Sequence, residues 1–173
     1  DWQAQSLAPS NHWPLEVVVA VTSHDAKAVS SSEGMERSRL TSPFYNQWLR
    51  SAGDDYAEAA LAIATRDFEK LATVAELSCL KMHSLMLTSS PTLSYWTPAS
   101  VACMDRIREL RNHGEAVFFT VDAGPQIKAV CLPESCVTVT KALSEVPGVL
   151  EILSCSLGEG ARIIDDEEPL TGR

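Results

Sequence analysis

The sequence lacks the patterns that mark metal proteins, secreted disulfide scaffolds and nucleic-acid binders. Its five cysteines form no CxxC pair and mostly lie in apolar stretches, which favours a reducing, cytoplasmic setting. The four histidines have no carboxylate or cysteine at ligand spacing, so we predict no metal held by this chain's own side chains. A formal net charge of -9 argues against nucleic acid as a partner.

Long apolar runs and a basic leader are also absent. No apolar stretch approaches the roughly 20 residues that a membrane span needs, so no membrane partner is expected. The 173 residues are 45% hydrophobic and 21% charged, which is typical of one ordinary globular domain. Because the chain begins with Asp1, we expect either a longer polypeptide or a cloning boundary before it.

The chain divides into a polar start, a periodic middle and an acidic end. Residues 1–14 are aperiodic and are expected to be a linker or the end of a missing N-terminal domain. Residues 15–164 hold the periodic segments and are expected to form the domain. Residues 165–173 begin with a cluster of four carboxylates without apolar partners and are expected to be a solvated acidic tail.

The middle segment alternates between strand and helix patterns. Residues 15–22 (LEVVVAVT) are too apolar to have a solvated face, so they predict a buried strand. Phe44, Tyr45, Trp48 and Leu49 have helical spacing and are expected to pack inward. The remaining pattern predicts helices over 30–40, 56–66, 67–88, 97–112 and 134–146, a hairpin of strands 116–121 and 127–132, and a last strand 149–154.

This order of elements suits an α+β fold. We predict an antiparallel sheet of about four strands that is covered on one side by helices.

The hairpin turn carries the residue best suited to chemistry, Asp122, which directly follows an apolar strand. Gly124 and Pro125 tighten the backbone beside it, so the carboxyl group can face a cleft. Burial at the strand end would raise its pKa, which is the usual environment of a general base or an orienting group. On physical grounds alone, the simpler alternative is that Asp122 only braces its own turn.

A second candidate is the start of the helix at Ser30. Ser30 and Glu33 have capping-box spacing, which by itself explains Ser30 as a helix cap. A helix N-terminus also offers free N–H groups to an anion, so Ser30 and Ser31 could hold a phosphate. His83 lies at the edge of an apolar stripe and is interpreted as a hydrogen-bonded core histidine.

Five segments in a single order resemble motifs of the diphosphomevalonate decarboxylases, which are members of the GHMP small-molecule kinase superfamily. Residues 117–128 (VFFTVDAGPQIK) are similar to their T-x-D-A-G-P-N signature, with Gln126 in place of the usual Asn. The other segments are residues 29–35 (VSSSEGM), 41–45 (TSPFY), 82–87 (MHSLML) and 91–96 (PTLSYW). Five co-linear segments are more specific than one motif, and the resemblance covers roughly residues 15–164.

The resemblance implies a fold, an activity and site residues. The fold is the ferredoxin-like C-terminal domain of GHMP kinases. The activity is ATP-dependent decarboxylation of mevalonate diphosphate to isopentenyl diphosphate, in the mevalonate pathway of isoprenoid biosynthesis. Asp122 matches the catalytic aspartate that acts on the 3-hydroxyl, and Ser31, with Ser30 beside it, matches the serine at the phosphates. Met35 is expected to line the pocket.

The resemblance also implies partners that this chain does not contain. ATP and Mg2+ would be bound mainly by an N-terminal GHMP domain that has no counterpart here, so the isolated chain is expected to be inactive. The complete enzyme is expected to be a cytoplasmic homodimer. Two other functions remain open at this point: a related GHMP enzyme, either a mevalonate 3-kinase or a phosphomevalonate decarboxylase, and a non-catalytic binding domain.

Overall fold

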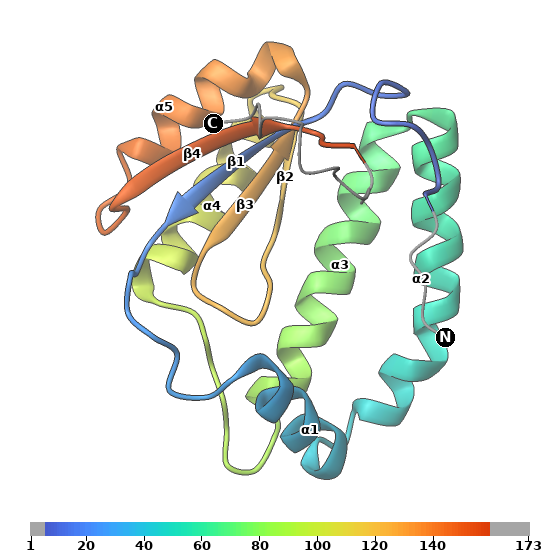
Figure 1. Ribbon diagram of the computed structural model, residues 1–173, viewed down its shortest axis with the longest axis vertical. Helices are drawn as coiled ribbons and strands as arrows, with labels where there is room; N and C mark the ends of the chain where they lie inside the picture. The colour runs from blue at the N-terminus through green and yellow to red at the C-terminus, as the bar shows by residue number, and fades with distance from the viewer. Residues whose placement is uncertain (1–5, 160–173) are drawn as a thin grey trace, which may run out of the picture.

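One antiparallel sheet organises the computed structural model of the chain, which describes residues 6–159 (Figure 1). Its strands follow the order β2-β3-β1-β4. They are β1 Glu16–Val21, β2 Val117–Thr120, β3 Ile127–Cys131 and β4 Glu151–Ser156. The predicted α+β fold with about four antiparallel strands is confirmed, and the strand order is that of a ferredoxin-like βαββαβ unit.

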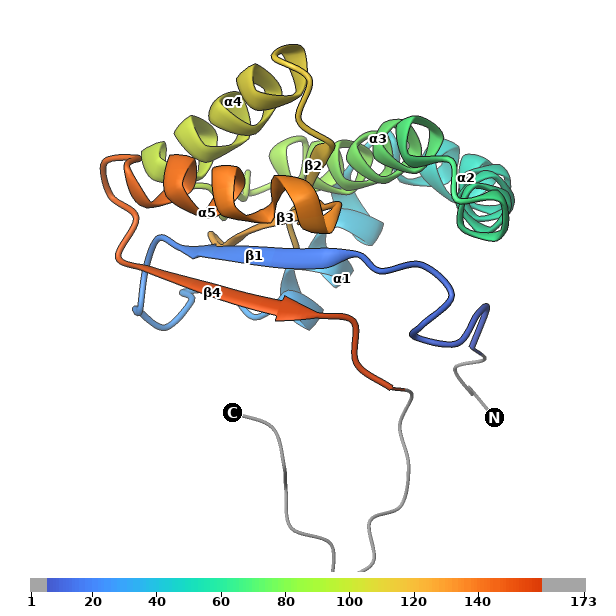
Figure 2. The same ribbon diagram turned by 90° about the horizontal axis from the view of Figure 1, so that it is seen from above.

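The helices cover one face of this sheet. They are α1 Ser31–Thr41, α2 Tyr45–Thr65, α3 Phe68–Leu87, α4 Pro98–Asn112 and α5 Cys136–Ser144, the last preceded by the 3-10 turn η1 Pro133–Ser135. Seen from above, α3, α4 and α5 lie on the same side of β1 and β4, and α2 runs alongside α3 (Figure 2). Within residues 6–159, no helix covers the opposite face at β1 and β4, whereas Phe118 on that face of β2 packs against α2 and α3.

Local signals in the sequence set several helix boundaries close to their predicted positions, but the helix predicted over 56–66 is longer and begins at Tyr45. Ser30 caps α1 and accepts a hydrogen bond from the backbone N of Glu33 at 3.2 Å. Arg66 takes a left-handed conformation, with φ of 57°, and ends α2. Asp67 then caps α3 by accepting a bond from the backbone N of Lys70 at 3.0 Å. Each cap satisfies a backbone N–H that the helix itself leaves unpaired.

The main core lies between the sheet and α3, α4 and α5. Alternate residues of each strand point to the helices, as the period of two requires. The fully buried side chains of this layer include Val18, Val117, Phe119, Ile127, Ile107 and Leu143.

The prediction that residues 15–22 are buried on both faces is wrong. Val18 and Ala20 are fully buried, but Val17 and Val19 on the other face are only half-buried. The reason is that, among the described residues, α2 and α3 reach the other face of the sheet only at β2, where they pack on Phe118, and no helix covers it at β1. On the outer face, the strand register places Val19 beside Lys128 of β3 and Leu153 of β4.

The prediction that the aromatic segment at the start of α2 packs inward is only half right. Trp48 and Tyr45 are half-buried and their rings lie 5.7 Å apart, whereas Phe44 and Leu49 are 54% and 51% exposed. Because α2 contacts α3 along one side only, the residues on its other side have no layer to pack against.

The predicted segment boundaries fall partly outside the described residues. Trp13, inside the predicted linker, is buried and meets Phe68 edge-on at 6.3 Å. The predicted acidic tail, residues 165–173, lies outside the described residues. The described helices include none with the length and apolar character needed to cross a membrane.

Candidate functional site

The hairpin turn between β2 and β3 is held from behind by α3. The backbone N of Val121 donates to Cys79 Sγ at 3.2 Å, and His83 Nε2 donates to the carbonyl oxygen of Val121 at 3.0 Å. Both α3 side chains are buried, and burial lowers the pKa of His83, so the imidazole is neutral where it holds this carbonyl. The interpretation of His83 as a hydrogen-bonded core histidine is confirmed, and the residue before Asp122 is fixed.

The far side of the turn is held by two other segments. The carbonyl oxygen of Pro125 accepts bonds from Thr22 Oγ1 at 2.9 Å and from Ser100 Oγ, in the first turn of α4, at 2.6 Å. Gln126 reaches the loop after β1: its Oε1 accepts from the backbone N of Thr22 and its Nε2 donates to the carbonyl of Ser23, both at 2.6 Å. Gln126, which stands where the signature has Asn, therefore links the turn to the loop that follows β1.

Asp122 projects from this clamped turn into solvent. Its side chain is 79% exposed and forms an ion pair with Lys128, whose side chain is 26% exposed. The expectation that the carboxyl group is buried at the strand end is therefore wrong for this chain. Val121 occupies the inward position, and the next side chain must point to the other face of the hairpin.

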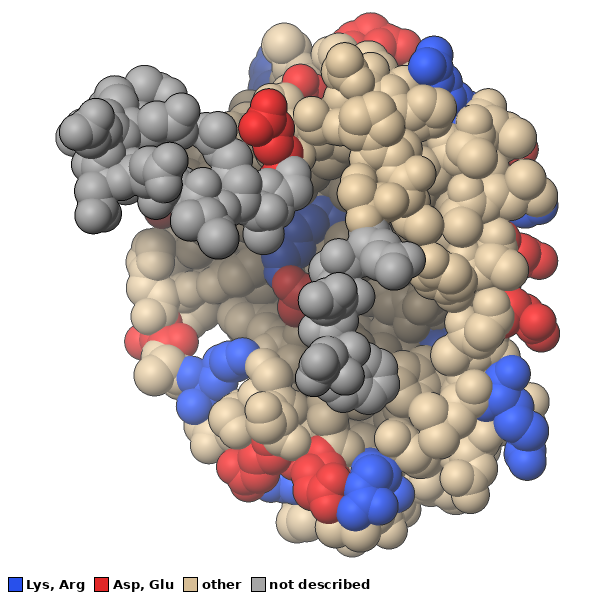
Figure 3. Space-filling model, turned by 45° about the vertical axis from the view of Figure 1, so that its right-hand side comes forward, with Lys and Arg blue, Asp and Glu red and all other residues tan. Residues whose placement is uncertain are grey.

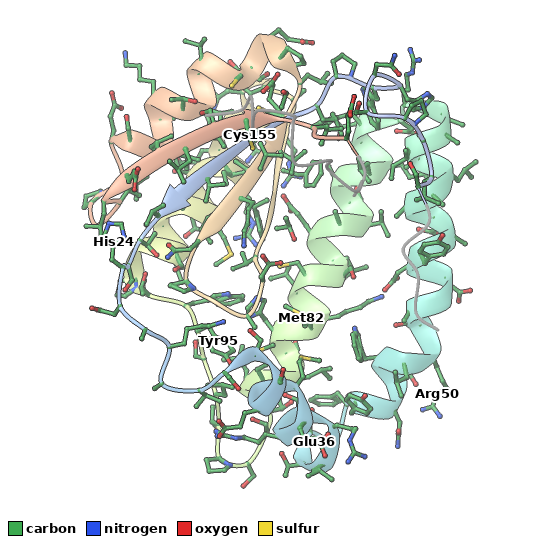
Figure 4. The ribbon with its side chains drawn as sticks, viewed as in Figure 1. His24, Glu36, Arg50, Met82, Tyr95 and Cys155 are labelled. Carbon is green, nitrogen blue, oxygen red and sulfur yellow. The ribbon has the colours of Figure 1, made fainter. Side chains whose placement is uncertain are left out.

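A cavity of about 440 Å³ opens beside this carboxylate. Trp48 and Tyr56 line it from α2, Cys79 and Met82 from α3, and Asp122 from the turn. Met82 is labelled on α3 in Figure 4. The space-filling view shows a hollowed surface with both basic and acidic atoms inside the hollow (Figure 3). Asp122 thus borders a cavity rather than only bracing its turn.

The N-terminus of α1 is linked to the same turn by a lysine. Lys27 Nζ donates to Ser31 Oγ and to the carbonyl oxygen of Ala123, both at 2.8 Å. Ser31 and Ala123, the residue after Asp122, are far apart in the sequence but therefore share one ammonium group. Ser30 uses its hydroxyl as the helix cap, and Met35 is half-buried one turn later without lining the cavity beside Asp122.

Tyr95 fixes the position of this helix start. Its hydroxyl lies 3.1 Å from the carbonyl oxygen of Val29 and 3.0 Å from that of Ser30, and shares its proton between them. Gly34 makes this approach possible, because a Cβ at that position would stand 2.6 Å from Tyr95 Oη. Figure 4 shows Tyr95 beside the first turn of α1.

A family model described as the mevalonate 5-diphosphate decarboxylase C-terminal domain matches residues 17–161. The chain belongs to this family.

Relatives of known name and structure agree with this membership. A diphosphomevalonate decarboxylase from Eremothecium gossypii is 30% identical over 153 residues, which are 86% of this chain and 38% of that protein. The crystal structure of mevalonate diphosphate decarboxylase from Staphylococcus aureus is 32% identical with a TM-score of 0.80, and the match covers 87% of this chain and 46% of that one. The enzyme from Enterococcus faecalis matches at 30% identity and a TM-score of 0.75, over 88% and 46% of the two chains.

The chain spans well under half the length of the curated relatives it matches. It corresponds to their C-terminal part, and the decarboxylase motif around Asp122 falls inside the matched residues. Two features of the site were missed from the sequence. Lys27 lies outside the quoted segments, and Lys128 ends the segment 117–128 without belonging to the signature itself; the fold brings them to Ser31 and Asp122.

The described residues do not gather into a metal centre. Within residues 6–159, no three His, Cys, Asp or Glu side chains lie together as a ligand set for an ion.

Proposed function

We propose that this domain supplies one wall of the active site of an ATP-dependent diphosphomevalonate decarboxylase, and that an N-terminal GHMP domain supplies the other. The observation that carries the proposal is the placement of Asp122. Its turn is clamped by α3 on one side and by α4 and the loop after β1 on the other, while its carboxylate, paired with Lys128, is exposed at the rim of a cavity. A rigid backbone with an exposed acid is what positioning a substrate group requires.

Asp122 would act on the 3-hydroxyl of mevalonate diphosphate. A tertiary alcohol is a poor nucleophile, and a carboxylate within hydrogen-bond reach orients it and accepts its proton as its oxygen bonds to the γ-phosphorus of ATP. ADP leaves, and the 3-phosphate and carbon dioxide are then eliminated to give isopentenyl diphosphate. Once the accepted proton has passed to solvent, the carboxylate is negative again and favours the positive charge that develops at the substrate carbon during elimination.

The start of α1 would hold phosphate oxygens. Lys27 offers an ammonium group, Ser31 a hydroxyl, and the helix end its free backbone N–H groups, all beside the Asp122 turn. The relative from Enterococcus faecalis is described by a mevalonate diphosphate mediated mechanism of ATP binding, which supports phosphate recognition in this family. Ser30 and Met35 would not contact the phosphate oxygens themselves. Ser30 would contribute as the cap that shapes this helix end.

The preceding domain would contribute what this chain lacks. The matched structures are about twice as long, so roughly half of such an enzyme precedes the matched region. Mg2+ ligands and most ATP contacts are assigned to that half. The isolated chain would be inactive, and the complete enzyme is proposed to be a cytoplasmic homodimer.

Replacing Asp122 by Asn in the full-length enzyme tests the proposal. The amide keeps the shape but accepts no proton, so ATP-dependent release of CO2 from mevalonate diphosphate should fall by about 100-fold or more. Near-normal release would remove Asp122 from the mechanism. Analysis of the products separates the related enzymes, because a 3-kinase yields a stable 3-phosphate without CO2.

A further inference from the structure

Lys128 lies on a strand, whereas the other basic residues that form ion pairs in the described part of the chain lie on helices. It belongs to β3, an interior strand of the sheet, and its Cα pairs with Thr120 on one side and Val19 on the other. Its side chain is only 26% exposed, whereas the carboxylate that it contacts, Asp122, is 79% exposed. The lysine is therefore the more buried partner of the pair, and the acid is the more exposed one.

The outer face of the sheet gives no packing reason for a charge at this position. Lys128 stands in a row with Thr120, Val19 and Leu153, where a valine would pack equally well and would not need to keep a charge near water. An ion pair as exposed as this one adds little to stability. The ion pair therefore contributes more by orienting the carboxylate than by stabilising the fold.

We infer that Lys128 is a positioning residue, which holds the Asp122 carboxylate in the direction of the cavity. This inference rests on the proposed function of Asp122 as the acid that acts on the substrate hydroxyl. The turn fixes the backbone of Asp122, since Val121 and Pro125 are bonded to α3 and α4, but it leaves the side-chain torsion free. Lys128 supplies the missing constraint from across the hairpin through its ion pair with Asp122.

The test uses the full-length enzyme with Lys128→Met, which retains the aliphatic stem and removes the ammonium group. A misdirected catalytic group costs about 10- to 100-fold in rate, so kcat should fall by that factor. The KM values for mevalonate diphosphate and ATP should stay within about twofold, because no binding group is lost. Lys128→Arg should restore most of kcat, since a guanidinium also holds a carboxylate.

A matched control comes from another lysine and carboxylate at the same cavity. Lys81 Nζ lies 2.8 Å from Asp55, with side chains 27% and 18% exposed, and Asp55 lines the cavity away from the turn. Lys81→Met removes an ammonium group of similar exposure, 27% against 26%, without touching Asp122, although its carboxylate partner is more buried. Its kcat should remain within about twofold of the unmodified enzyme, and thermal unfolding of both methionine variants shows whether either fold is damaged.

Three results would overturn the inference. They are an unchanged kcat in Lys128→Met, a raised KM with kcat unchanged, and a failure of Lys128→Arg to exceed Lys128→Met. The double variant Lys128→Met with Asp122→Asn tests whether Lys128 acts through Asp122. If it does, kcat of the double variant should equal that of Asp122→Asn alone. If Asp122→Asn alone is inactive while Lys128→Met is normal, this inference fails and the proposed function stands; if Asp122→Asn is active, the proposed function itself fails.

Discussion

Replacing Gly34 by Ala tests the contact that joins α1 to the segment before α4. A Cβ at residue 34 would stand 2.6 Å from Tyr95 Oη and 2.9 Å from Leu93 Cδ2. Both distances are shorter than van der Waals contact, so Tyr95 must move away from the start of α1. That movement breaks the bonds that its hydroxyl makes to Val29 and Ser30.

The expected change in the free energy of unfolding combines two destabilising effects and one stabilising effect. Forcing an extra carbon into a packed contact costs about 1–3 kcal/mol, and the loss of the Tyr95 hydrogen bond adds about 1 kcal/mol. Alanine in a helix interior returns about 1 kcal/mol relative to glycine. The free energy of unfolding should therefore fall by about 1–3 kcal/mol, or about 2–4 °C in Tm for each kcal/mol in a chain of this size.

Gly53 in α2 provides the matched control. A Cβ there would meet nothing within 4 Å, so Gly53→Ala should raise the free energy of unfolding by up to about 1 kcal/mol. Urea unfolding of the two variants, with the unchanged chain alongside, separates the clash from the helix preference. Tyr95→Phe removes the oxygen that meets the new carbon, so stability lost in Gly34→Ala should be partly regained in the double variant. Equal stability of Gly34→Ala and Gly53→Ala would refute the reasoning.

Two further predictions concern buried titratable groups. Burial lowers the pKa of His83 below its usual value of 6.5, so the unfolded chain binds a proton more readily than the folded chain. The free energy of unfolding is therefore unaffected by the titration of this residue above pH 6.5, and it falls as the pH is lowered below that value. His83→Gln should lose less unfolding free energy than the unchanged chain between about pH 7 and pH 5, as urea unfolding at each pH would show. Burial also raises the pKa of Cys103 to about 11 and of Cys131 to about 12. A thiol reagent near neutral pH should label the exposed Cys155 on β4 (Figure 4), and label Cys103 and Cys131 only after denaturation, as mass spectrometry of the peptides would show.

Much of the fold was predictable because its signals are local. Ser30, Arg66 and Asp67 set helix boundaries through their own backbone and side-chain bonds, and strand patterns of period two located the hairpin. The errors arose where burial depends on a distant partner. Val17 and Val19 look as buried as their neighbours in the sequence, yet no helix covers their face.

The candidate site shows the same division. The sequence by itself determined the family, the position of Asp122 after a strand, and the cap at Ser30, because each depends on residues adjacent in the chain. Only the tertiary structure brought Lys128 to Asp122, Lys27 to both Ser31 and Ala123, and the amide of Gln126 to the strand β1. Those contacts join segments that the chain separates, and strand register and loop closure, which no local pattern encodes, decide which side chains meet.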